Sequence, residues 1–410
     1  MRTTLASILF LALAAGIGPG PVSAQTASLA TEVAEPFKLG TFQIDGQDRL
    51  GIVLRDQFVV DLHQANHNLE RNYRYAPVPM PDHMISLIER YDYGLKNRIY
   101  EIVNYALDSG HLSGSTPAYV HRVQDIRTLA PIQRPYPTKI LNAAVNYFDH
   151  ISEGASDEER EQAIAERQAD RGHPYLFHKT VEGGVIGDGD TIVIPYGRDR
   201  ADWEVELSAV IGRTAKYVPA TEADDHIFGY TIQIDVSDRG GRPGGGSDWY
   251  VGKGRDTYAP IGPWITPKEF FEYPNRHIGQ RLLLNGATMQ DSGTDDMIHS
   301  VAELIEYGSS VSTLYPGDVV AAGSPAGVGS GIAVRGYQWF MQDGDFVVAE
   351  IEGIGALRHP VRQETSRPDG TGSFLPPTPW SPDDAPSTPW ETEPTVDRND
   401  LRWSQQPAME

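Results

Sequence analysis

The chain has 410 residues, no cysteine and a formal net charge of −22 at pH 7. A chain of this length has room for two domains and a large core. The strong negative charge argues against binding to nucleic acid or to an anionic membrane surface, because both need a basic protein surface. Without cysteine there is neither a disulfide nor a thiol nucleophile.

The first 24 residues have the features of an export signal. Arg2 gives a short positive start, residues 5–17 are apolar, and Val-Ser-Ala at 22–24 offers a cleavage site. The apolar stretch is short for a membrane span, although an uncleaved anchor is the alternative. We expect an exported protein, periplasmic or secreted, with no stable membrane anchor after cleavage.

Residues 36–135 are expected to form a small N-terminal α/β domain. Alternating apolar segments predict strands over 37–44, 50–54 and 58–62, the first two joined as a hairpin. Apolar residues at helical spacing predict a helix over 84–107.

A second, larger domain is expected over residues 136–362, with many short strands separated by Gly, Pro and Asp. A helix is predicted over 157–169, with almost no apolar face, which suits a mobile lid or a surface excursion. Another is predicted over 297–307. The Pro-rich residues 363–410 indicate an extended or disordered tail.

Three carboxylates are the strongest candidates for a functional site. Glu204 and Glu206 project to the same side of a predicted strand, and Asp235 lies in another alternating segment. Carboxylates placed this close repel each other unless a positive charge lies between them. Together they could hold a hard divalent cation, with Mg²⁺ or Mn²⁺ preferred over Ca²⁺. The alternative is a solvated acidic strand face.

Two further segments carry candidate catalytic groups. His150 and Glu153 are spaced so that one helical turn would bring them into contact, and a carboxylate beside an imidazole suits a water-activating base. Lys253 lies between glycines, where the backbone can approach a ligand. Taken alone, these residues are better explained by a surface His–Glu pair and a solvated loop lysine. A serine hydrolase is disfavoured, because Pro325 occupies the middle of Gly323–Gly327.

In sequence order, these segments resemble the fumarylacetoacetate hydrolase family over residues 139–357. The matching motifs include Asn146-Tyr-x-x-His150-x-x-Glu153, Asp202-x-Glu-Val-Glu-Leu207, Gly229-Tyr-x-x-x-x-Asp-Val-Ser237, Gly252-Lys253 and Gly323-x-Pro-Ala-Gly-Val-Gly329. The resemblance implies an α+β, β-rich fold with a mixed β-roll or sandwich main domain, and usually a homodimer.

The resemblance also implies a role for each candidate residue. The metal ligands would be Glu204, Glu206 and Asp235, and the catalytic residues His150, Glu153 and Lys253. The substrate carboxylate would bind at Arg239, Arg242 and Ser324. Positions 242 and 324 depart from the residues usual in the family, Gln and Thr, so a specific substrate does not transfer.

The implied activity is metal-dependent hydrolysis of a C–C bond in a 2,4-dioxo, acylpyruvate-like acid through an enolate. The nearest alternative is isomerisation, decarboxylation or dehydration of a 2-oxo acid at the same site. A more distant one is a non-catalytic exported protein that binds a metal or ligand, or that holds a structural Ca²⁺.

Overall fold

The structure is a computed structural model that describes residues 29–113, 116–153, 155–241, 248–332 and 340–365. The predicted export signal, most of the predicted tail and Arg242 lie outside these residues, so the predictions for them stay predictions. No described helix has the length and apolar character needed to cross a bilayer.

The strands are β1 (Lys38–Ile44), β2 (Gln47–Leu54), β3 (Phe58–Asp61), β4 (Val120–Arg122), β5 (Arg127–Leu129), β6 (Ile140–Ala143), β7 (Leu176–His178), β8 (Val185–Ile186), β9 (Ile192–Ile194), β10 (Ala201–Asp202), β11 (Val205–Ile211), β12 (Ile227–Ile234), β13 (Ser237–Asp238), β14 (Ala259–Pro267), β15 (Gly279–Leu284), β16 (Ala287–Gly293), β17 (Val319–Ala321), β18 (Phe346–Ile351) and β19 (Gly355–Gln363). The α-helices are α1 (Leu62–Glu70), α2 (Met84–Arg90), α3 (Lys96–Asp108), α4 (Asp157–Ala169), α5 (Trp249–Lys253), α6 (Val301–Val311) and α7 (Gly329–Ile332).

Two mixed sheets form the body of the protein, in agreement with the predicted α+β, β-rich class. The larger runs β4-β3-β2-β1-β14-β12-β11-β17-β6-β7, with β5 beside β1 and β8 beside β14. The smaller runs β16-β15-β18-β19-β9. Apolar side chains of β11 and β12 pack against those of β15 and β18 in one continuous core, which places the two sheets face to face.

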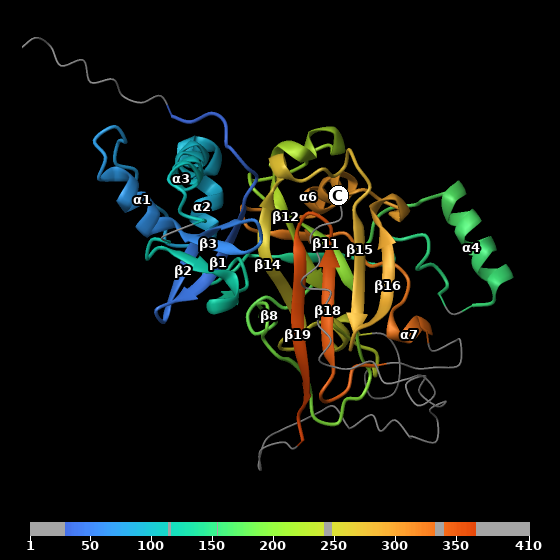
Figure 1. Ribbon diagram of the computed structural model, residues 1–410. Helices are drawn as coiled ribbons and strands as arrows, with labels where there is room; N and C mark the ends of the chain where they lie inside the picture. Colours follow the sequence, from blue (N-terminus) through green and yellow to red (C-terminus); the bar gives the residue numbers. More distant parts are fainter. Residues whose placement is uncertain (1–28, 114–115, 154, 242–247, 333–339, 366–410) are drawn as a thin grey trace, which may run out of the picture.

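The leading strands belong to the larger sheet, because β1 hydrogen-bonds to β14 with Leu39 opposite Ile265. Helices α1, α2 and α3 lie together on this side of the molecule, whereas α4 projects from the opposite side (Figure 1). A second apolar cluster joins these helices to residues of β14, including Ile261 and Ile265. The division into two domains stays a prediction.

Several predicted elements differ from the structure in their limits. The helix expected over 84–107 is broken into α2, a π-helical turn at Tyr91–Leu95, and α3, because Gly94 has a φ of +101°. The helix expected over 297–307 begins at Val301, since the Ser300 side chain accepts from the Glu303 N–H in a capping box. Helix α1, capped by Asp61, was not predicted. Helix α4 has the predicted limits and no buried residue.

Candidate active site

Strand geometry brings the three predicted carboxylates together. In β11 the odd-numbered residues from Val205 to Ile211 enter the core between the sheets, so Glu204 and Glu206 face the other way. Strand β12 pairs with β11 in antiparallel register, with Val205 opposite Ile234, and Asp235 N donates to Glu204 O at 2.8 Å. One ligand oxygen from each carboxylate lies within 4.8 Å of the other two, and all three residues are buried.

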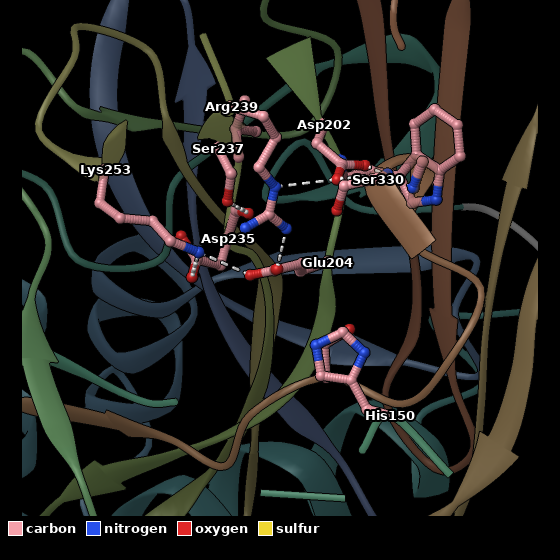
Figure 2. Close-up of polar contacts among 12 residues, drawn as sticks. His150, Asp202, Glu204, Asp235, Ser237, Arg239, Lys253 and Ser330 are labelled. Atoms are coloured by element: carbon pink, nitrogen blue, oxygen red, sulfur yellow. Dashed lines mark hydrogen bonds and ion pairs between the residues drawn. The ribbon is translucent and has the colours of Figure 1, made fainter. Parts of the chain in front are cut away.

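Cationic side chains surround this cluster, and the two lysines among them are buried. Lys253 Nζ lies 2.7 Å from Glu204 Oε2 and 2.6 Å from Asp235 Oδ2. Lys179 Nζ contacts the other oxygen of Asp235 at 2.6 Å. From the opposite side of Glu204, Arg239 reaches Glu204 and also Asp202, the latter at 3.0 Å (Figure 2).

The electrostatic balance differs between the three carboxylates. Burial would raise the pKa of Glu204, but Lys253 and Arg239 hold it well below its usual value. Burial and repulsion from Asp235 and Glu204 instead raise the pKa of Glu206 well above its usual value. Among the described residues, no ion pair reaches Glu206; its Oε2 accepts from Gly323 N at 2.9 Å. The cluster therefore favours one more positive charge beside Glu206.

The residues present fit a hard divalent cation. Three carboxylates offer the oxygen donors that Mg²⁺, Mn²⁺ and Ca²⁺ prefer. Close to Glu206, the buried Asn142 Oδ1 has no hydrogen-bond partner in the part of the chain that the structure describes. A buried polar atom of this kind is normally satisfied by water or an ion. The structure thus favours the metal-site hypothesis over a solvated strand face.

The predicted His–Glu pair is present, although not on a helix. Residues 148–153 form turns, in which Ser152 has a φ of +50°. His150 Nδ1 lies 2.7 Å from Glu153 Oε2, and the other oxygen of Glu153 accepts from Gly327 N. His150 lies across Glu204 from Arg239 (Figure 2). The dyad therefore faces the carboxylate cluster.

The backbone of residues 323–327 connects these two groups. Gly323 N donates to Glu206, Ala326 N donates to Asp149 at 3.0 Å, and Gly327 N donates to Glu153. Gly323 needs to be glycine, because it has a φ of +83° and an added Cβ would lie 2.8 Å from Asn146 Cβ. One loop thus fixes both the cluster and the dyad.

The three predicted substrate-binding residues differ in their surroundings. Arg239 lies at the cluster, but its guanidinium already pairs with Asp202 and Glu204. Ser324 is buried, and its hydroxyl accepts from Gln290 Nε2 at 2.7 Å. Arg242 lies outside the described residues. Their substrate-binding roles stay predictions.

Two charged residues of the site were not singled out from the sequence. Lys179 follows His178 at the end of the segment Tyr175-Leu-Phe-His-Lys179, where no neighbouring residue gives a sign of a buried ion pair. Asp202 accepts from Trp203 N, Gly329 N and Ser330 N and pairs with Arg239, so it joins the site to the start of α7. Its place in the same motif as Glu204 was the available signal.

Comparison with known proteins agrees with this geometry. A family model described as "Fumarylacetoacetate (FAA) hydrolase C-terminal" matches residues 139–362. The chain belongs to the fumarylacetoacetate hydrolase family. It is therefore an enzyme of the hydrolase type or a related isomerase or lyase.

Relatives within the fumarylacetoacetate hydrolase family have different activities in their names. The chain is 37% identical over 235 residues to the mitochondrial oxaloacetate tautomerase FAHD2A of Bos taurus, covering 57% of this chain and 68% of that protein. It is 36% identical over 226 residues to 2,4-didehydro-3-deoxy-L-rhamnonate hydrolase of a Sphingomonas species, covering 55% and 73%.

A solved structure of the same family contains a metal. Maleylpyruvate hydrolase from Sphingobium sp. SYK-6, in complex with manganese(II) and pyruvate, aligns with a TM-score of 0.57 and 27% identity. The alignment covers 80% of this chain and 99% of that one. The predicted family and fold class are confirmed.

Proposed function

We propose that this protein is a metal-dependent hydrolase that cleaves a C–C bond in a 2,4-dioxo acid resembling an acylpyruvate. The observation that carries the proposal is the His150–Glu153 dyad, facing a buried carboxylate cluster. A base that faces a site for an electrophilic cation suits attack of water on a carbonyl.

Glu204, Glu206 and Asp235 are the residues that would hold the divalent cation, with Mg²⁺ or Mn²⁺ preferred over Ca²⁺. The bound ion would supply a Lewis acid that draws electron density from the oxygens of an oxo acid. The manganese and pyruvate in the Sphingobium relative support a small oxo acid as the ligand of this site.

His150 serves as the base in this proposal. The Glu153 carboxylate can only accept a hydrogen bond, so the proton lies on His150 Nδ1 and leaves Nε2 to take a proton. Glu153 also stabilises the imidazolium that forms. Because its second oxygen is held by Gly327 N, the dyad stays oriented toward the cluster.

Lys253 acts on the part of the substrate that becomes negatively charged during the reaction. Water, losing its proton to His150, adds to the C4 carbonyl of the 2,4-dioxo acid, and the C3–C4 bond then breaks. Its electron pair passes to the pyruvate fragment as an enolate, which gains a proton at C3, and a carboxylic acid leaves. Lys253 offers a buried ammonium where that charge develops, and one such contact lowers a barrier by about 3 kcal/mol.

A second candidate is isomerisation of a 2-oxo acid at the same site. The name of the Bos taurus relative, an oxaloacetate tautomerase, favours this alternative. The dyad that deprotonates water could instead take the proton from an enol oxygen and deliver it to C3, without breaking a C–C bond. Decarboxylation or dehydration would use the same enolate.

The experiment that separates these activities is product analysis by NMR. The purified protein is incubated with 2,4-dioxopentanoate and, separately, with enol oxaloacetate, with Mg²⁺ or Mn²⁺ present. The hydrolase proposal predicts pyruvate and acetate in equal amounts from the first, and none after chelation. Enol-to-keto conversion of oxaloacetate without cleavage of the dioxo acid would instead establish the tautomerase.

We also propose that the protein is exported and forms a homodimer, as the sequence and the resemblance suggest. N-terminal sequencing of protein secreted by its host tests the first, with Gln25 as the expected first residue. Light scattering of the purified protein tests the second.

A further inference from the structure

An aromatic row runs from the catalytic lysine toward solvent. Lys253 Nζ lies 5.0 Å from the ring centroid of Phe177. Phe177 lies 4.7 Å from Trp249, and Trp249 lies 5.5 Å from Tyr175, centroid to centroid. Exposure rises along the row, from 8% for Phe177 to 41% for Trp249 and 50% for Tyr175. The row therefore leads out of the buried charged site.

Strand pairing places this row on the same sheet face as the carboxylates. Phe177 in β7 is directly opposite Asn142 in β6, and Asn142 Nδ2 donates to Gln233 Oε1 at 2.8 Å. Gln233 in turn is opposite Glu206. Directly paired residues share a face, so Phe177, and Tyr175 two residues before it, lie on the face that carries Glu206.

The backbone beside the outer end of the row leads to another exposed apolar residue. Ala144 N donates to Tyr175 O at 2.9 Å, and the next residue, Val145, is 49% exposed with a φ of +49°. This left-handed conformation is energetically unfavourable for a β-branched residue. Such backbone strain is common at ligand sites. Exposed apolar side chains therefore lie at the outer end of the row.

We propose that Phe177, Trp249 and Tyr175 form a subsite for the group beyond C4 of the substrate, and that this group is planar and apolar, such as an aryl ring. The inference rests on the proposed function, which places the oxo-acid end at the carboxylates and Lys253. The distal group then lies along the aromatic row, where rings stack on planar apolar groups. A small acyl group would leave Trp249 and Tyr175 uncovered.

The test compares two substrates within each variant. We measure kcat/KM for 4-phenyl-2,4-dioxobutanoate and for 2,4-dioxopentanoate in the wild type, in Trp249→Ala and in Tyr175→Ala. The wild type is expected to prefer the phenyl compound, and Trp249→Ala to reduce that preference about tenfold or more, the usual value of one apolar contact in a binding pocket. Tyr175→Ala is expected to act in the same direction. A ratio measured within one variant does not depend on how much of it folds.

Tyr250→Ala is the matched control, since Tyr250 follows Trp249 on α5, is 79% exposed and has no place in the aromatic row. Its substrate ratio should equal that of the wild type. An unchanged ratio in both Trp249→Ala and Tyr175→Ala overturns the subsite, and so does a change as large in Tyr250→Ala.

A binding measurement separates failure of the subsite from failure of the proposed function. Calorimetric titration with Mn²⁺ present compares 4-phenyl-2-oxobutanoate with 2-oxopentanoate, neither of which has a C4 carbonyl to hydrolyse. If neither dioxo acid is cleaved, but 4-phenyl-2-oxobutanoate binds more tightly and Trp249→Ala removes this difference, the hydrolase proposal fails and the subsite stands. If both dioxo acids are cleaved and 4-phenyl-2-oxobutanoate has no advantage over 2-oxopentanoate, the subsite fails alone.

Discussion

Lys179 and Asp235 form an ion pair in which both side chains are fully shielded from solvent, with 2.6 Å between Nζ and Oδ1. Lys179 also donates to Val236 O at 2.8 Å. Burial lowers the pKa of Lys179 to about 8, despite the attraction of Asp235. Lys179 and Lys253 thus hold the two oxygens of Asp235 from different sides. Asp235 is fixed at the centre of the site by residues far apart in the sequence.

Replacing Lys179 with Met should destabilise the protein by about 3 kcal/mol, because it leaves the buried Asp235 with one partner fewer. Urea unfolding without added metal measures this loss. The matched control is Lys268→Met, since the Lys268–Asp224 pair has side-chain exposures of 30% and 68%. That exposed pair should contribute less than about 1 kcal/mol. Equal losses in the two variants would contradict a structural role for Lys179.

Glu153→Gln should reduce kcat on a 2,4-dioxo acid by roughly 100-fold or more, the usual contribution of a positioned acid–base group. The amide can accept from His150 Nδ1, but it cannot stabilise a charged imidazolium. Steady-state kinetics measure the change. Glu158→Gln, at an exposed position at the start of α4, is the control and should keep wild-type kinetics. Wild-type turnover in Glu153→Gln would contradict a catalytic role for the His150–Glu153 dyad.

Stability should fall on acidification because of His359. Burial lowers the pKa of this histidine from 6.5 to about 4, and its Nδ1 hydrogen-bonds to Asp190 O at 2.8 Å. Between these pKa values the unfolded chain binds a proton that the folded chain does not. The stabilisation that comes from keeping His359 neutral is therefore fully present above pH 6.5. It is lost as the pH falls toward 4.

His359→Gln should flatten this part of the pH dependence, measured by urea unfolding across the same interval. The exposed His67 in α1 offers the comparison, and His67→Gln should keep the wild-type slope. If the His359→Gln and wild-type curves run parallel, acid sensitivity arises elsewhere in the molecule.

The sequence was sufficient to predict those helices and strands that depend on contacts between residues close together in the chain. The first hairpin and α4 follow from alternation and from the Ser156–Glu159 capping box, which act within a few residues. The break at Gly94 was missed, because apolar periodicity continues across it. The start of α6 was placed early, since the capping box at Ser300 was not weighed against the preceding apolar residues.

Most residues of the site could be predicted from the sequence, but the contacts between them could not. Alternation pointed to Glu204, Glu206 and Asp235, local spacing pointed to His150 and Lys253, and the family motifs assigned a role to each. The pairing of Asp202 with Arg239 depends on β10 and β13 meeting, with Asp202 opposite Ser237. The burial of Lys179 depends on β7 lying beside β6 at the edge of the larger sheet. Such contacts follow from tertiary packing, which no spacing in the sequence encodes.

Calorimetry of Mn²⁺ binding to the metal-free protein tests the metal-site proposal most directly. We expect one ion per chain in the wild type and at least about tenfold weaker binding in Glu206→Gln, with Glu158→Gln as the unaffected control. We also expect 2,4-dioxopentanoate to be cleaved only by the metal-loaded protein. Equal Mn²⁺ affinity in Glu206→Gln and the wild type, or full turnover in the presence of a chelator, would contradict the proposal.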